Sequence, residues 1–539
     1  MRRGIAAAAL VLLLLGGAWA LTRRTPSDPG PPSPSAASSP VASPAAGPNP
    51  PAETAEQVRL HARDGLIRDN CSKCHVFPDP KILPKNIWGK KVLKMHDLAN
   101  QVLLETRNRP LRDVKPEEVI EYMEAFAPEA LDTPPWAAVE SRPGLRFEEH
   151  RRRASDPKLT PPGVGGIFLE ELFEDLPGRE MVVCDMLSGL VTWGRPADVD
   201  APLKTIAQLR NPVRARATDL DWDGKTDLLV ADLGSGPPTD DPCGSVEWLR
   251  RTGPRTFEKI TILQGVGRVA DARAADLDGD GDLDVAVSAY GWFTTGRSLI
   301  LWNRGKVPGG LPVFEEETLD ERNGSITCPV VDLDGDGRPD ILLLVAQENE
   351  VISAYMNRGG GKFMEEKIFV GPHPHFGSSA MEVADVDGDG DLDVVMVNGD
   401  TLDDRIQFKP WQGVTWFENR GAFPFEAHWL GTYYGVQAVS VADIDGDGDL
   451  DIVASSMLPR CDPEDQKRMK LPSAAWWEQT SRGVFKAWTL LPGLCENPTV
   501  TTGDVDGDGK TDILLGVMRL EEGKAEKGPL LVKVLLQRK

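Results

Sequence analysis

The sequence has too little positive charge for a nucleic-acid partner. Its 60 Lys and Arg residues stand against 83 Asp and Glu residues, which gives a formal net charge of -23 at pH 7. Binding to a phosphate backbone needs a basic face, so we expect no nucleic-acid partner. The chain has 539 residues, of which 40% are hydrophobic and 27% charged. These fractions are typical of globular proteins. The length predicts two or more domains.

Catalytic and zinc signatures are also lacking. We find no Ser-His-Asp set, no paired-carboxylate spacing and no zinc signature, so the sequence assigns no catalytic residue and leaves open whether the protein is an enzyme. Cysteine is scarce, with seven residues in the whole chain. Cys71 and Cys74 form one motif, and five are scattered: Cys184, Cys243, Cys328, Cys461 and Cys495. These five cannot all pair, and Cys461–Cys495 is the disulfide that we predict.

The N-terminus has the pattern of an export segment. Arg2 and Arg3 precede an apolar run that ends near Ala18-Trp19-Ala20, a small-x-small cleavage pattern. Residues 1–20 are therefore a signal peptide or, if uncleaved, a membrane anchor, because the 17 apolar or small residues from Ile5 to Leu21 barely suffice to span a bilayer. Both interpretations place the rest of the chain outside the cytoplasm, in the periplasm or at the cell surface.

The next segment, residues 21–55, is dominated by Pro, Ser, Ala and Gly. Such a composition cannot bury enough apolar surface to fold, and it predicts an extended linker. It leads into "CSKCH" at residues 71–75.

C-x-x-C-H is a covalent haem-attachment motif. Two thiols at this spacing can each form a thioether with a haem vinyl group, and His75 then lies under the iron. A zinc site would need two more ligands, yet no other cysteine lies within 100 residues. A redox C-x-x-C usually belongs to a thioredoxin-like pattern, which is absent. The motif therefore predicts haem c at Cys71, Cys74 and His75.

Residues 56–132 resemble the small c-type cytochromes in three elements. A first helix runs into CSKCH, Met95 follows, and "KPEEVIEYMEAFAPEAL" from residue 115 has the spacing of a closing amphipathic helix. The resemblance implies an all-α domain in which Met95 is the second axial ligand of the iron. His96 is the alternative ligand, and Met95 could instead be a core residue. The short spacing between His75 and Met95 departs from the usual pattern.

Six acidic loops of nine residues follow the pattern D-x-D-x-D-G-x-x-D, with spacings of 53 to 61 residues. Carboxylates at positions 1, 3, 5 and 9 around a turning glycine provide the oxygen ligands of a calcium site. The loops lack the Glu of an EF-hand at position 12, and strand-like sequences such as "DVAVSAY" follow them. We expect each loop to be a hairpin that binds one Ca²⁺, up to six in all.

The predicted calcium ligands are Asp219, Asp221, Asp223 and Asp227; Asp276, Asp278, Asp280 and Asp284; Asp332, Asp334, Asp336 and Asp340; Asp385, Asp387, Asp389 and Asp393; Asp443, Asp445, Asp447 and Asp451; and Asp504, Asp506, Asp508 and Asp512.

Two more strand-like segments follow each loop, as in "LILWNRG…VFEEETL", so one repeat is a four-stranded antiparallel sheet. Such repeats at this period resemble propeller blades of the FG-GAP or VCBS type, which occur in integrin α-subunit heads and in exported bacterial proteins. Residues 173–193 fit a degenerate first blade that lacks the aspartates of a calcium loop, and with the six repeats this makes seven blades. The resemblance implies an all-β, seven-bladed propeller over residues 140–539, in which "GLRFEEHR" at 144–151 completes the last blade.

Three functions fit this combination. The first is an exported electron-transfer protein whose propeller is a docking or binding platform for a redox partner or a small molecule. The second is a dehydrogenase that passes substrate electrons to haem, and the third is an adhesion propeller that binds a carbohydrate or a protein. Candidate ligand-binding residues at the propeller mouth are Arg268, Asp271, His373, His375, Tyr433 and Tyr434.

Overall fold

The computed structural model describes residues 55–61, 63–72, 76–105, 114–137, 140–153, 161–176, 178–198, 201–306, 311–401, 407–519 and 530–538. The chain divides into two units, residues 1–53 and 54–539. The predicted export segment, most of the linker and the residues Cys74 and His75 lie outside the described residues. Within the described part, no helix is both long and apolar enough to cross a bilayer.

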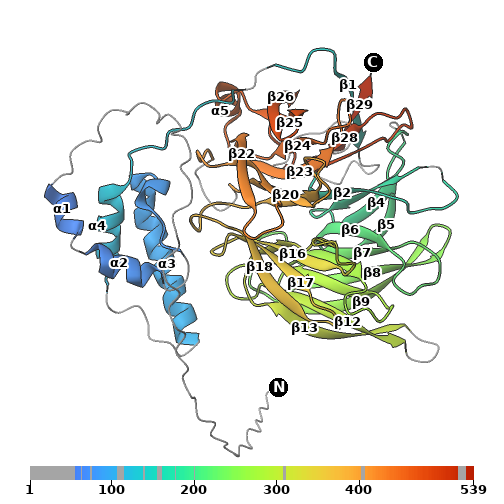
Figure 1. The fold of residues 1–539 in the computed structure, drawn as a ribbon, viewed down its shortest axis with the longest axis horizontal. Helices are drawn as coiled ribbons and strands as arrows, with labels where there is room; N and C mark the ends of the chain where they lie inside the picture. Colours follow the sequence, from blue (N-terminus) through green and yellow to red (C-terminus); the bar gives the residue numbers. More distant parts are fainter. Residues whose placement is uncertain are drawn as a thin grey trace, which may run out of the picture. The chain divides into compact units, whose positions relative to one another are not determined.

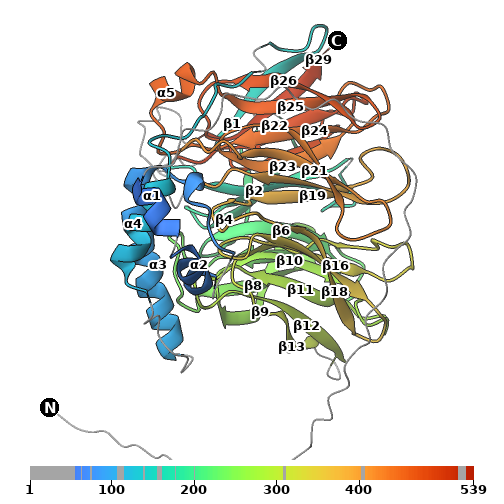
Figure 2. The same ribbon diagram turned by 60° about the vertical axis from the view of Figure 1, so that its left-hand side comes forward.

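Helices occupy the region before the repeats. They are α1 (Ala55–His61), α2 (Asp64–Cys71), the short 3₁₀ turn η1 (Pro80–Ile82), α3 (Lys85–Glu105) and α4 (Pro116–Phe126). Pro116 starts α4, where its missing N–H costs nothing. The core between the helices contains Trp88 and Met123, both fully buried, and the Trp88 indole donates a hydrogen bond to the Pro80 carbonyl at 2.9 Å. Figure 2 shows α3 and α4 running beside each other.

Seven antiparallel sheets form the propeller, as predicted. The first three are β2–β5 (Val164–Glu170, Glu180–Asp185, Leu190–Gly194, Lys204–Gln208), β6–β9 (Pro212–Thr218, Asp227–Asp232, Gly244–Gly253, Thr256–Val266) and β10–β13 (Val269–Ala275, Asp284–Ala289, Arg297–Lys306, Pro312–Asp320).

The next three are β14–β18 (Ser325–Thr327, Val330–Val331, Asp340–Val345, Val351–Asn357, Phe363–Val370), β19–β22 (Ala380–Ala384, Asp393–Asn398, Gly413–Glu418, Glu426–Thr432) and β23–β26 (Val436–Ala442, Asp451–Ser456, Pro472–Ser481, Val484–Pro492). The helix α5 (Pro463–Arg468) lies between β24 and β25.

In the fourth sheet the first strand is split into β14 and β15 at Pro329, which has no N–H to donate to the ladder.

The seventh sheet joins the two ends of the propeller. It consists of β27 (Val500–Gly503), β28 (Asp512–Gly516), β29 (Leu530–Arg538) and β1 (Arg146–Arg153), in the order β1-β29-β28-β27. Arg146 pairs with Arg538, and Val532 with Arg152. Figure 1 shows β1 beside β29. The predicted closure by residues 144–151 is therefore confirmed.

Burial follows the position of each strand within its sheet. The first strand of each sheet contacts the first strands of its neighbours, so these strands form a ring around the propeller axis. The second strand is buried along its whole length in all seven sheets, and its sequences are correspondingly apolar, as in "DILLLV". The outermost strands carry charge, as in the "VFEEETL" segment of β13, which protects the edges from pairing with other chains.

Candidate functional site

Each acidic loop is a hairpin between the first and second strands of a sheet, as predicted. Its first aspartate turns back onto the loop: Asp276 accepts hydrogen bonds from the backbone N–H groups of Gly279 (2.8 Å) and Gly281 (3.0 Å). Both glycines have positive φ, of 82° and 93°, which explains the preference for glycine at these positions. The loop conformation therefore follows from its sequence alone.

Carboxylate oxygens converge in the loops. In three loops the ligand atoms of positions 1, 3 and 9 lie within 4.8 Å of one another, as for Asp276, Asp278 and Asp284. In the loop that begins at Asp332, the atoms that lie this close belong to positions 1, 3 and 5: Asp332, Asp334 and Asp336. A set of oxygens held this closely suits a hard cation such as Ca²⁺. The geometry fits the predicted ion, and the donors are those that the sequence pattern identified.

The aspartate at position 9 of each loop also has a structural role. The buried Asp284 accepts hydrogen bonds from the N–H of Leu277 in its own loop (3.0 Å) and from the N–H of Asn303 at the end of the third strand (2.8 Å). The same pair of bonds recurs at Asp340, Asp393, Asp451 and Asp512. Burial, followed by the nearby Asp278 and Asp280, raises the pKa of Asp284 to about 6. A bound cation would offset this cost of burying the carboxylate.

A repeated Asn-Arg-Gly motif belongs to the same hydrogen-bond network. Its role was not predicted from the sequence. The Asn357 amide donates to the carbonyls of Pro339 (3.0 Å) and of Leu277 in the preceding sheet (2.8 Å). Its own carbonyl accepts the N–H of Gly359 (2.9 Å). The motif thus ties one acidic loop to the neighbouring sheet, and its threefold recurrence as "NRG" was the signal in the sequence.

In all six loops an arginine pairs with the aspartate at position 3. The six pairs are Arg250–Asp221 (2.7 Å), Arg304–Asp278 (3.7 Å), Arg358–Asp334 (3.8 Å), Arg482–Asp387 (3.2 Å), Arg142–Asp445 (2.9 Å) and Arg538–Asp506 (2.7 Å). These arginines reduce the mutual repulsion of the loop carboxylates. The loops therefore have partial charge compensation from the protein itself.

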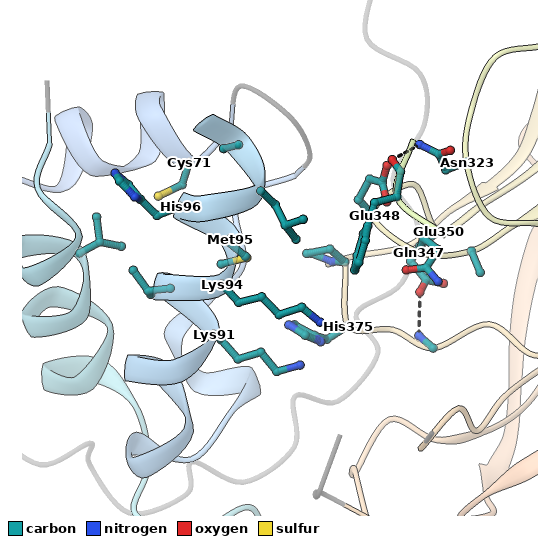
Figure 3. A pocket seen from close by; sticks show the side chains of 18 of the residues that line it. Cys71, Lys91, Lys94, Met95, His96, Asn323, Gln347, Glu348, Glu350 and His375 are labelled. Carbon is teal, nitrogen blue, oxygen red and sulfur yellow. Dashed lines mark hydrogen bonds between the residues drawn. The ribbon is translucent and has the colours of Figure 1, made fainter. Parts of the chain in front are cut away.

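A cavity of about 530 Å³ adjoins the helices and is drawn in Figure 3. Its volume falls within the roughly 300–1,000 Å³ of small-molecule and cofactor sites. The helical wall includes the Cys71 thiol, Met95 and His96, together with the apolar side chains of Val92 and Val119. The structure therefore brings the described residues of the predicted haem site to one cavity. Met95 and His96 both lie within α3, and burial raises the pKa of Cys71 to about 11.

The remaining wall of the cavity comes from propeller loops. It includes Tyr290, Phe293, Glu348, Glu350 and His375. Glu350 is buried and accepts hydrogen bonds from the N–H groups of Gly377 (2.9 Å) and Ser378 (3.1 Å). Burial raises the pKa of Glu350 to about 7. This wall offers carboxyl groups and one imidazole, whereas the helical wall offers sulfur, apolar side chains, the His96 imidazole and the Lys91 and Lys94 ammonium groups.

The loop that contains Phe293 is held by one carboxylate. Asp240 accepts hydrogen bonds from four consecutive backbone N–H groups, Trp292 to Thr295, at 2.8 to 3.3 Å. The Lys94 ammonium of α3 lies 5.1 Å from the Phe293 ring centroid and 5.7 Å from that of Trp292. This loop therefore contributes both to the cavity wall and to a contact with the helices.

Several predicted mouth residues are structural instead. Tyr433 and Tyr434 are core residues, 0% and 1% exposed, whose hydroxyls donate to the carbonyls of Pro472 and Pro134 at 2.9 Å. Arg268 and His373 are also buried. Of the predicted mouth residues, His375 lines the cavity, and Asp271 lies in the ring of first strands.

The disulfide prediction is wrong. Both Cys461 and Cys495 are free thiols. The Cys495 sulfur lies 3.5 Å from the Pro472 carbonyl and the Cys461 sulfur lies 3.7 Å from that of Asp462, so each thiol faces a backbone oxygen instead of the other sulfur.

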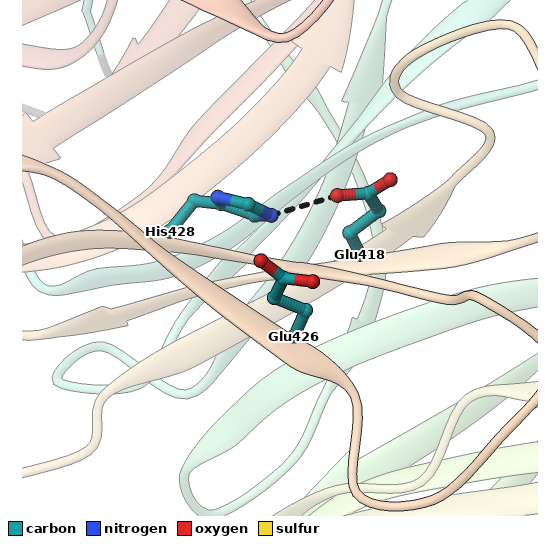
Figure 4. Close-up of side chains that lie close together, drawn as sticks. All are labelled: Glu418, Glu426 and His428. Carbon is teal, nitrogen blue, oxygen red and sulfur yellow. Dashed lines mark hydrogen bonds and ion pairs between the residues drawn. The ribbon is translucent and has the colours of Figure 1, made fainter. Parts of the chain in front are cut away.

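A further cluster of possible metal ligands lies on β21 and β22: Glu418, Glu426 and His428 (Figure 4). The His428 Nε2 lies 2.7 Å from Glu418. Arg420 pairs with both glutamates, at 2.8 and 2.6 Å. Because the guanidinium already compensates the carboxylates, we assign this cluster to stability.

Two families of repeats match parts of the propeller. The FG-GAP-like repeat family matches residues 219–287, 332–396 and 397–454, and the FG-GAP repeat family matches residues 497–528. Protein FAM234A of Bos taurus is 33% identical over 123 residues, which are 22% of this chain and 19% of the relative. The chain thus spans about a fifth of that relative's length.

The solved structures that are similar to this chain are distant from it. A streptogramin B lyase is 12% identical, with a TM-score of 0.44, over 73% of this chain and 98% of the other. A selenomethionine-substituted virginiamycin B lyase from Staphylococcus aureus is 10% identical, with a TM-score of 0.43, over 72% and 99%. The chain contains FG-GAP repeats, and they build a seven-bladed β-propeller.

Proposed function

We propose that this protein is an exported electron-transfer protein, with haem c at the helical wall of the cavity and the calcium-bound propeller as its binding platform. The observation that carries the proposal is the meeting of the Cys71 thiol and the Met95 thioether at one largely apolar cavity. The C-x-x-C-H sequence supplies the second thiol, Cys74, and the ligand His75.

The side chains at the helical wall match what a haem needs. Cys71 and Cys74 would attach it, and His75 with Met95 or His96 would coordinate the iron. Apolar residues such as Val92 and Val119 would cover its face and limit the entry of water. A bound haem supplies reversible one-electron chemistry, and a thioether ligand raises its potential relative to a second histidine.

The test starts with the full chain, expressed in a host that attaches haem. After denaturation and acid-acetone extraction, the haem should remain with the polypeptide, and the double variant Cys71→Ser, Cys74→Ser should carry none. Extraction of all the haem from the wild type would contradict covalent attachment. A wild type without haem would contradict the proposed function and leave the propeller as a binding platform.

The axial ligand is tested separately. Met95→Ala should lose the long-wavelength methionine–iron charge-transfer band and lower the midpoint potential. His96→Ala should keep both. Met364→Ala is the control, because Met364 is an exposed residue on β18, 45% exposed, and should change neither property. A band that survives in Met95→Ala and disappears in His96→Ala would refute the assignment.

The cavity's propeller wall favours a second candidate, a dehydrogenase. Glu348, Glu350 and His375 offer groups that can accept the protons released when a substrate is oxidised. Reduction of the haem on addition of a sugar or alcohol, abolished in Glu348→Gln, would support this function over simple electron transfer. Binding of a glycan by the full chain without any change in the haem spectrum would favour the adhesion alternative.

An extracytoplasmic location belongs to the same proposal. FG-GAP repeats, the similarity to part of FAM234A and the export pattern of residues 1–20 support a chain that is extracellular or associated with a membrane. Calcium is abundant there, so the acidic loops can be occupied. Cell fractionation with an epitope after Lys539 tests the location, which a cytoplasmic signal would contradict.

A further inference from the structure

The ring of first strands carries a charged cluster that the proposed function does not use. Two positions matter, five and three residues before each acidic loop. The earlier position holds Arg214 on β6 and Asp271 on β10. The later position holds Arg216 on β6, Arg273 on β10 and Glu382 on β19. We call these five residues the axial cluster.

Asp271 has no remaining capacity for a ligand. It is fully buried and accepts hydrogen bonds from Arg214 (3.1 Å), from the Arg273 Nε (3.1 Å) and from the Thr327 hydroxyl (2.6 Å). Burial by itself raises the pKa of a carboxyl, but here Arg273 and Arg214 outweigh that effect and hold the pKa of Asp271 well below its usual range. Asp271 is therefore a charged anchor that orients two of the three arginines.

Arg216 is the member of the cluster that has an N–H group without a hydrogen-bond acceptor. Its Nε is buried without a hydrogen-bond partner among the described residues, and its closest carboxylate oxygen, on Glu170, is 3.8 Å away. The guanidinium lies 4.1 Å from the Phe168 ring centroid. Burial, and then the charges of Arg273 and Arg214, lower the pKa of Arg216 to about 10. A buried guanidinium Nε without an acceptor, held beside other guanidiniums and paired within the described part of the chain only with Glu170 at 3.8 Å, is an unfavourable arrangement that a bound anion would relieve.

These side chains are open to solvent on one side. Arg216 and Arg273 are 29% and 24% exposed, and Glu382 is exposed, although their strands are the innermost of the propeller. A hollow of about 400 Å³, lined by Glu170, Ala217 and Thr218, opens beside this end of β6. The exposed fractions show that solvent reaches Arg216 and Arg273, and Glu170, the ion-pair partner of Arg216, also lines the hollow.

Glu382 limits the charge of that ligand. Among the described residues it makes no hydrogen bond or ion pair, and it lies near enough to Arg216 and Arg273 for their charges to act on it. Three guanidiniums face three carboxyl groups, counting Asp271, Glu170 and Glu382. Because the charges balance, every negative charge of a ligand is an excess charge in the cluster, and a singly charged ligand is therefore less unfavourable than a doubly charged one.

We propose that Arg216 and Arg273 bind a small carboxylate at the propeller axis. A carboxylate has two parallel acceptors that match the fork of a guanidinium, and it carries a single charge. The remaining donors of Arg273 and all those of Arg216 supply the contacts, while Phe168 and Asp271 hold the two arginines in place. This site is separate from the cavity beside the helices.

Isothermal titration calorimetry tests the proposal. Acetate and inorganic phosphate are titrated separately into the full chain in low-chloride buffer. Acetate should bind saturably. Arg216→Gln should weaken it at least tenfold, and Glu382→Gln should strengthen it about threefold because the repelling charge is removed. The control Arg297→Gln changes an exposed arginine of β12, paired with Glu316, and should leave the affinity unchanged.

Other outcomes would overturn the proposal. These are the absence of acetate binding, binding that survives in Arg216→Gln, or binding of phosphate without acetate. If Arg216→Gln fails to fold, Arg216→Lys can replace it, because lysine keeps the charge but lacks the two parallel N–H donors of the guanidinium. Arg216→Lys should still weaken the binding of acetate by several fold. Binding of acetate by Arg216→Lys at wild-type affinity would also contradict the site.

Discussion

The loop beginning at Asp276 provides a decisive test of calcium binding by single substitutions. Asp278→Asn removes one charge from the oxygens that converge with Asp276 and Asp284. Asp282→Asn removes the same charge from the same loop, but Asp282 is not a member of that cluster. With calcium present, the first variant should be destabilised and the second should behave as the wild type.

The magnitude follows from mass action. A site at 100 times its dissociation constant contributes about 2.7 kcal/mol. The propeller region has about 400 residues, and an unfolding entropy of about 2.1 cal/mol/K per residue makes 1 kcal/mol equivalent to about 1.2 °C. Loss of this ion should therefore lower Tm by about 3 °C. Loss of all six ions by chelation should lower it by about 20 °C.

The loss of Tm caused by Asp278→Asn should disappear or reverse when calcium is removed. Without the ion, Asp278 repels Asp284, and its ion pair with the exposed Arg304 at 3.7 Å contributes at most about 1 kcal/mol. Asp278→Asn should then lie within about 1 °C of the wild type, or above it. Calorimetry of the full chain with calcium and with chelator measures both values. Equal losses of Tm in the two conditions, or equal losses in the two variants, would refute calcium binding at this loop.

Three other perturbations test separate parts of the structure. Glu350 has a folded pKa of about 7, above its usual value of 4.5, so the folded state holds a proton that the unfolded state has lost between these pH values. Stability should therefore fall as pH rises from about 4.5 to 7, by at most about 1.4 kcal/mol per unit for this group. Glu350→Gln should flatten that slope in urea titrations, and an unchanged slope would contradict the assignment. Trp136 is 6% exposed and packs against Tyr433 and Trp477, so Trp136→Ala should cost about 3–5 kcal/mol in chemical denaturation; a cost below about 1 kcal/mol would show that it is not a core residue. Asp240→Ala should speed amide hydrogen exchange at Trp292 to Thr295 alone. The control Asp241→Ala should leave exchange at these amides unchanged. Faster exchange across the whole propeller in Asp240→Ala would contradict this local role.

The propeller was predictable because its determinants are local. The acidic loops fix where a first strand ends and a second begins, and the apolar run after Asp284 or Asp340 identifies the buried second strand. The closure by Arg146–Arg153 followed from a count of strands in the last repeat. The roles of the aspartate at position 9 and of Asn357 were not visible, because each has a partner far away in sequence: Asp340 accepts from Asn357, 17 residues away, and Asn357 donates to Leu277, 80 residues away.

The site was predictable only in part. Cys71 and Met95 could be singled out from the sequence, by the C-x-x-C-H motif and by the methionine that follows it, and both line the cavity. Their role in binding haem stays a prediction. The propeller wall of the cavity could not be predicted, since Tyr290, Gln347 and His375 come from three loops that are far apart in sequence. Tyr433 and Tyr434 were misassigned because a polar aromatic at a loop position can equally be a buried residue whose hydroxyl meets a backbone carbonyl.

The pairing of β1 with β29 has a consequence for the order of folding. Six sheets form from neighbouring segments and can assemble as the chain emerges in sequence. The seventh needs Arg146 to meet Arg538, so its β1 strand must wait until nearly all of the propeller sequence has been made. Contacts between such distant segments slow folding. The seam between β1 and β29 should therefore close last, and until then the chain presents an unpaired edge on which chaperones, proteases or a second copy of the chain can act.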